Sequence, residues 1–131
     1  MKHLLKGVLV FAVTILFFTC KKDTTGISQI ITTARWTVNY YHNNGVDLTS
    51  SFNGYVFTFT NDDSVKVSNG TSVIATGTWR ADDSKNELHL IINSPFDSIN
   101  KGWIVFEKTN TDFKLKDDNT VSTEELHFIK D

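Results

Sequence analysis

The feature that most constrains this chain is an alternation of apolar and polar residues that begins near residue 35 and continues to the C-terminus. Successive side chains of a β-strand point to opposite faces, so this alternation predicts strands with one buried face. Asn, Asp, Gly and Ser interrupt the alternation at short intervals, which predicts tight turns. The expected strands cover residues 35–42, 53–60, 64–69, 72–81, 87–93, 102–109, 112–117 and 124–130.

Short connections imply that consecutive strands are antiparallel neighbours. An open sheet of eight strands has two exposed edges, and pairing of the first strand with the last removes both. The sequence therefore predicts an all-β fold, an eight-stranded antiparallel up-and-down barrel. A β-sandwich is the alternative, because alternation does not distinguish one closed sheet from two packed sheets.

The segment before the first strand has a different period. Ile27, Ile30, Ile31 and Ala34 recur at helical spacing, which predicts one short amphipathic helix, although Ile and Thr also favour a strand.

Alternation also predicts which side chains point inward. One strand is ambiguous, since Trp103 and Val105 compete with Ile104 and Phe106 for the interior. The inward set of the other strands is Trp36, Val38, Tyr40, Tyr55, Phe57, Phe59, Val65, Val67, Val73, Ala75, Trp79, Leu88, Leu90, Ile92, Phe113, Leu115, Leu126 and Phe128.

The first nineteen residues have the composition of a secretory signal, with Lys2 and Lys6 ahead of an apolar run over 7–18. This run is shorter than the roughly 20 apolar residues of a membrane-spanning helix. The single cysteine, Cys20, follows it and has no second cysteine for an internal disulfide. We expect a signal peptide at 1–19, a tether at 20–27 and one domain at 28–131.

Two resemblances add to this division. The stretch "FFTCKKD" resembles the lipobox of bacterial lipoproteins, and "ARWTVNYY", "FNGYVFTFTNDDSVKVSNG" and "GTW" resemble the lipocalin-like domains of Bacteroidetes lipoproteins. The first resemblance implies that Cys20 becomes the acylated first residue of the mature protein, anchored in the cell envelope, at the outer membrane. The second implies an up-and-down barrel that is closed at one end by Trp36 and the N-terminal turn.

Charge and motif content exclude several function classes. Without Lys2 and Lys6 the chain has 11 basic against 15 acidic side chains, so no nucleic-acid partner is expected, and we expect a monomer. His42, His89 and His127 fall in separate strands, with the last two predicted to face solvent. The acidic pairs at 62–63, 82–83 and 117–118 are predicted to be turn caps, and 124–125 a charged strand start. We therefore expect no enzyme, metal or cofactor.

Two function classes remain. In the first, the barrel binds a small, mostly apolar ligand between side chains of the inward set, namely Trp36, Tyr40, Tyr55, Phe57, Phe59, Trp79 and Leu90. In the second, the interior is filled and an outer surface contacts another protein, as in an inhibitor of an exported hydrolase. The loop "NSPFDSIN" at 93–100, with Phe96, is then either the contacting loop or a lid. Space inside the barrel distinguishes the two classes.

Three triplets, "DTT" at 23, "DSV" at 63 and "DSI" at 97, resemble an O-glycosylation site of Bacteroidetes exported proteins. Ordinary turn sequence is the competing interpretation.

Overall fold

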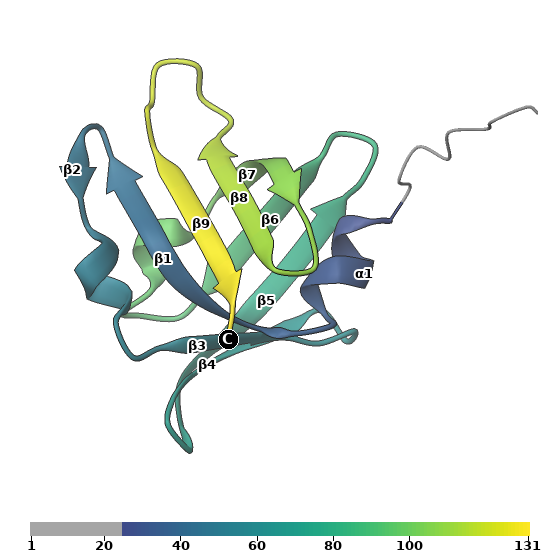
Figure 1. Ribbon diagram of the computed structural model, residues 1–131, viewed down its shortest axis with the longest axis vertical. Coiled ribbons are helices and arrows are strands. Elements are labelled where there is room, and N and C mark those ends of the chain that lie inside the picture. The colour runs from purple at the N-terminus through teal and green to yellow at the C-terminus, as the bar shows by residue number, and fades with distance from the viewer. Residues whose placement is uncertain (1–24) are drawn as a thin grey trace, which may run out of the picture.

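The computed structural model describes residues 25–131, which form strands, one short α-helix and two 3₁₀ helices (Figure 1). Residues 1–24, with the expected signal peptide and Cys20, lie outside the described residues. The elements in chain order are α1 (Ile27–Ile31), β1 (Arg35–Asn43), β2 (Val46–Asp47), η1 (Thr49–Phe52), β3 (Val56–Phe59), β4 (Ser64–Asn69), β5 (Ser72–Asp82), β6 (Glu87–Ile92), η2 (Asp97–Ile99), β7 (Gly102–Lys108), β8 (Asp112–Asp117) and β9 (Glu125–Lys130).

All strands belong to one antiparallel sheet with the order β2-β1-β3-β4-β5-β6-β7-β8-β9. The sheet closes because β1 also pairs with β9, from Trp36 opposite Lys130 to His42 opposite Glu125. The result is an eight-stranded barrel with β2 as a short addition beside the end of β1. The predicted barrel and N-terminal helix are confirmed, and the sandwich alternative is wrong. Neither β2 nor η1 was expected from the sequence.

The core follows the predicted alternation over most strands. In β7 the structure decides which pair points inward: Trp103 and Val105 are buried, whereas Phe106 is exposed. The buried apolar side chains form one cluster inside the barrel.

Two irregularities in strand pairing move residues away from their predicted faces. The register of β1 against β9 shifts between Val38 and Tyr40, so Tyr41 is buried and Tyr40 lies on the outer wall. A second shift, between Val67 and Ser68, leaves Val73 exposed. The inward assignment of Tyr40 and Val73 is therefore wrong, since one extra residue in a strand reverses the alternation beyond it.

The helix closes one end of the barrel, called here the helical end. The side chains of Ile27, Ile30 and Ile31 are buried, and the indole Nε1–H of Trp36 donates a hydrogen bond of 2.8 Å to the carbonyl of Ile31. The backbone N–H of Ile27 donates to Asp83 Oδ1 at 2.7 Å. Ile27, the last residue of the expected tether and the first apolar position of the predicted helix, begins α1.

The opposite end, called the lid end, is covered by η1 and η2. Phe52 of η1, and Phe96 and Ile99 at η2, are buried there. Within residues 25–131 no helix is long and apolar enough to cross a membrane.

Candidate functional site

The barrel interior was the predicted ligand site, and the structure brings most of its proposed residues together. Trp36, Phe57, Phe59, Trp79 and Leu90 are all buried in the core cluster. Tyr55 is partly buried and packs against the cluster at the lid end. Tyr40 is excluded, because it lies on the outer wall.

The interior aromatic rings contact one another. Phe57 and Phe59 each meet Phe128 edge to face, with ring centroids 5.3 and 6.0 Å apart, and Phe59 also meets Trp79 at 6.0 Å. These separations are those of directly packed aromatic pairs. Three of the rings that were expected to line a ligand cavity, those of Phe57, Phe59 and Trp79, are therefore packed against neighbouring aromatic rings.

The loop at 93–100 continues this packing across the lid end. The ring of Phe96 lies 5.0 Å from that of Tyr55, 5.7 Å from that of Phe57 and 6.1 Å from that of Phe52. The side chain of Asn100 secures the loop, since it accepts a 2.6 Å hydrogen bond from the N–H of Ile92 and donates a 2.7 Å bond to its carbonyl. Of the two interpretations of this loop, the structure selects the lid.

A polar network lies beside the lid, and the sequence analysis missed it. Glu124, expected as a charged strand start, has only 3 % of its surface exposed. Its Oε1 accepts a 2.6 Å hydrogen bond from the hydroxyl of Tyr41, and its Oε2 pairs with Nζ of Lys101. Lys101 also pairs with Asp117 at 3.3 Å. Glu124 is two residues before Leu126 and four before Phe128, which are both buried. Continued alternation from these two residues could have predicted that Glu124 points to the inner face.

Burial and hydrogen bonding shift the pKa values of Tyr41 and Lys101. Burial raises the pKa of the Tyr41 hydroxyl, and the hydrogen bond to Glu124 raises it further. Burial acts to lower the pKa of Lys101, but the hydrogen bonds and charges of Glu124 and Asp117 outweigh it and raise that pKa. The network thus holds a neutral tyrosine and a charged lysine around a buried carboxyl group, and it joins β1 to the loops before β7 and β9.

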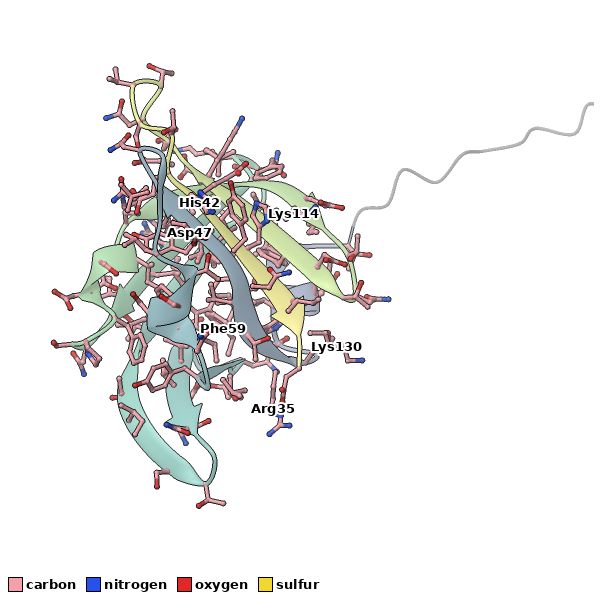
Figure 2. The ribbon with its side chains drawn as sticks, turned by 60° about the vertical axis from the view of Figure 1, so that its left-hand side comes forward. Arg35, His42, Asp47, Phe59, Lys114 and Lys130 are labelled. Carbon is pink, nitrogen blue, oxygen red and sulfur yellow. The ribbon has the colours of Figure 1, made fainter. Side chains whose placement is uncertain are left out.

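His89 and His127 are placed on the outer wall, as predicted, although they are partly covered, and His42 joins His127 in a stack of rings there. Tyr40 stacks between His42 and His127, with ring centroids 4.1 and 4.3 Å away, and Phe106 meets His127 edge to face at 5.9 Å. His42 also lies 3.6 Å from Asp47 of β2 (Figure 2). Burial lowers the pKa of His127. Both faces of the Tyr40 ring are covered. Because Tyr40 and His42 belong to β1 and His127 belongs to β9, these stacked rings hold the two strands together.

The first member of each acidic pair caps a turn, as predicted, whereas Asp83 accepts a hydrogen bond from the N–H of Ile27. Asp62 Oδ1 accepts the backbone N–H of Ser64 at 3.2 Å, and Asp82 Oδ1 accepts that of Ser84 at 3.1 Å. Hydrogen bonds from the hydroxyls of Ser64 and Thr60 lower the pKa of Asp62 to about 2. Among residues 25–131 no group of three or more His, Cys, Asp or Glu side chains could hold a metal ion.

Two of the grooves on the surface of residues 25–131 border residues discussed above. The first, of about 470 Å³, follows the outer wall of β5, β6 and the start of β7, with Ile91, Arg80 and His89 among its lining residues. Gly102 lines this groove, and the ring of His89 lies 2.9 Å from where a Cβ of residue 102 would be. The second, of about 670 Å³, runs along the loop between β8 and β9. Trp79 and Leu90 are the proposed ligand residues that border the first groove.

Fold and interior together define a class of protein, a closed antiparallel β-barrel with one apolar core cluster in which aromatic rings contact one another. The crystal structure of a DUF4847 family protein from Bacteroides vulgatus ATCC 8482 has a similar fold, with a TM-score of 0.61 over 81 % of this chain and 98 % of that one. The two sequences are 13 % identical, so the likeness concerns the fold alone. No protein-family model matches this chain, and no curated protein matches it.

Proposed function

We propose that this chain is a lipoprotein of the cell envelope, held at the outer membrane by acylated Cys20, whose barrel is a non-enzymatic interaction module. The anchor is supported by the sequence, in which the single cysteine directly follows a signal-like apolar run. Two or three acyl chains hold a protein at a membrane far more firmly than one chain does.

The observation that carries the proposal is the continuous packing of aromatic rings from Trp79 through Phe59, Phe128 and Phe57 to Phe96. A carrier of an internal ligand needs space at the positions that these rings occupy. The barrel is also covered by α1 at one end and by η1 and η2 at the other. This arrangement supports an outer surface as the functional one, in preference to the predicted apolar ligand in the interior.

The buried polar groups support a structural role over an enzymatic one. Lys101, Glu124 and Tyr41 form the polar network beside the lid, in which Glu124 engages both the Tyr41 hydroxyl and the Lys101 ammonium group. A catalytic acid or base needs a free path to its substrate.

Thermal unfolding with a panel of fatty acids, sterols and haem-like compounds tests the filled interior. A compound present at a hundredfold its Kd stabilises the folded state by about 2.7 kcal/mol, which raises the Tm of a domain of this size by roughly 10 °C or more. We expect no such shift, and no co-purified small molecule in native mass spectrometry of the protein from its host. A reproducible shift or a bound ligand would reinstate the interior site and refute the proposal.

A further inference from the structure

The hairpin of β4 and β5 extends beyond the barrel wall at the lid end, with its tip away from the other strands (Figure 2). Near this tip Val73 and Ile74 have 55 % and 44 % of their surface exposed. They come from adjacent positions of one strand, where regular alternation would expose only one of the two.

A β-bulge explains this double exposure. Ala75 pairs with Val67 and Val73 pairs with Ser68, so Ile74 has no residue opposite it in β4. An extra residue of this kind turns two neighbouring side chains toward the same face. The bulge therefore makes an aliphatic patch on the outer face of the hairpin.

The same part of β5 has a free edge. Strand β6 ends with Ile92 opposite Gly77, and the N–H of Asn93 donates a 3.1 Å hydrogen bond to the carbonyl of Thr76. The chain then turns inward, where Phe96 closes the lid end. In the described part of the chain, residues 72–75 pair with β4 on one side and with no strand on the other.

This edge is short and carries the bulge at Ile74, but it lacks the charges and prolines that block many exposed edges. Exposed edges are normally blocked by Lys, other charges or Pro, because their unpaired N–H and C=O groups accept another strand. The stretch from Ser68 to Gly77, "SNGTSVIATG", contains no charged residue and no proline. An apolar face beside an unpaired, uncharged backbone edge is suited to an extended polypeptide, which supplies a row of alternating donors and acceptors as well as side chains.

We propose that the β5 edge at residues 72–75 binds an extended segment of a partner protein by strand addition, with aliphatic side chains of the partner packed on Val73 and Ile74. This inference rests on the proposed interaction function and names its surface. A lipid or a sugar would use the apolar patch but leave the backbone edge unpaired.

A display library of eight-residue peptides with alternating aliphatic and polar residues provides the probe. Selected peptides are measured by fluorescence anisotropy against the whole mature chain. Upon binding we expect amide hydrogen exchange at residues 72–76 to slow at least tenfold. Ile74→Lys should weaken binding at least tenfold, whereas Val121→Lys, at an 86 % exposed position in the loop before β9, should change it less than twofold. Both side chains are exposed, so equal Tm values will show that each variant is folded.

Several results would overturn the inference. The inference fails if the selection yields no binding peptide, or if Ile74→Lys leaves peptide binding unchanged. It also fails if amide exchange slows only at the groove that includes Ile91. Sedimentation velocity that shows a dimer abolished by Ile74→Lys would assign the edge to a second copy of this chain instead. Because the ligand panel probes the interior and the peptides probe the hairpin, failure of either test leaves the other interpretable.

Discussion

At the scale of the residue, Trp36 shows how far sequence reasoning reaches. Its parity in the first predicted strand placed it inside the barrel, and the resemblance to lipocalin-like domains implied that it closes one end together with the N-terminal turn. The structure confirms this, with no exposed surface on Trp36 and its indole N–H bonded to Ile31. The ring also meets Phe113 edge to face at 6.0 Å.

Replacing Trp36 with Ala should lower the free energy of unfolding by about 3 to 5 kcal/mol, the usual range for a buried large aromatic side chain. Urea denaturation measures this loss. Trp36→Phe keeps most of the packing but leaves the Ile31 carbonyl without its donor, so it should cost about 1 to 3 kcal/mol. A loss below about 1 kcal/mol for the Ala variant would show that the ring contributes little to the core.

The network at the lid end makes stability depend on pH in the alkaline range. The folded-state pKa values of Tyr41 and Lys101 are both raised, so the native protein holds their protons more tightly than the unfolded chain. Their contribution is complete below the unfolded pKa values near 10 and is lost as the pH rises through the folded values.

We therefore expect the free energy of unfolding, followed by urea denaturation, to decline above about pH 10. Tyr41→Phe should reduce the slope of this decline, because the variant has no phenol to ionise. The control is Tyr40→Phe, which removes a hydroxyl outside the network. If the two variants showed equal slopes, the decline would have another origin.

At the scale of the element, strand pairing decides which face a residue occupies. Tyr40 and Tyr41 are chemically equivalent neighbours, and a register shift in β1 sends the second inward. The barrel also depends on the close approach of β5 and β6 at Gly77. A Cβ at that position would lie 2.2 Å from the carbonyl oxygen of Ile91 and 2.6 Å from Cα of Ile92.

Gly77→Ala should therefore separate β5 from β6 and cost about 1 to 3 kcal/mol or more, as overpacking does. Equilibrium denaturation gives the magnitude, and amide exchange in β6 should become faster. The matched control is Gly70→Asn, since the tip glycine has a φ of +60° that Asn tolerates and no atom within 4 Å of its would-be Cβ. Equal stability of the two variants would contradict a clash at Gly77.

At the scale of the whole molecule, the place where the chain joins the folded domain decides which end of the barrel would face the membrane. Thr25 is fixed at the helical end, where its carbonyl accepts a 2.7 Å hydrogen bond from Nζ of Lys108. Residues 20–24 can span no more than about 18 Å. If Cys20 is anchored as proposed, the helical end lies near the membrane, and the lid end with the β4–β5 hairpin faces away from it.

Cys20→Ala should release the protein from the membrane fraction without changing the Tm of the barrel, because the described core begins only at Ile27. Detergent-phase partitioning and a thermal scan of the released protein measure the two effects. Retention of the Cys20→Ala protein in membranes after a high-salt wash would refute the lipid anchor.

The sequence by itself determined the order of most strands, the helix and most of the inner face, because period-two alternation and turn residues are local properties, whereas the pairing of β1 with β9 decided for the barrel against the sandwich. Only the tertiary structure decided the rest. It placed Tyr40 outside and Val73 on the surface, since bulges depend on the pairing of two strands. It turned the Phe96 loop into a lid and paired Glu124 with Tyr41, 83 residues away in sequence. Whether rings fill a barrel or line a cavity depends on distances between strands, which no local pattern records.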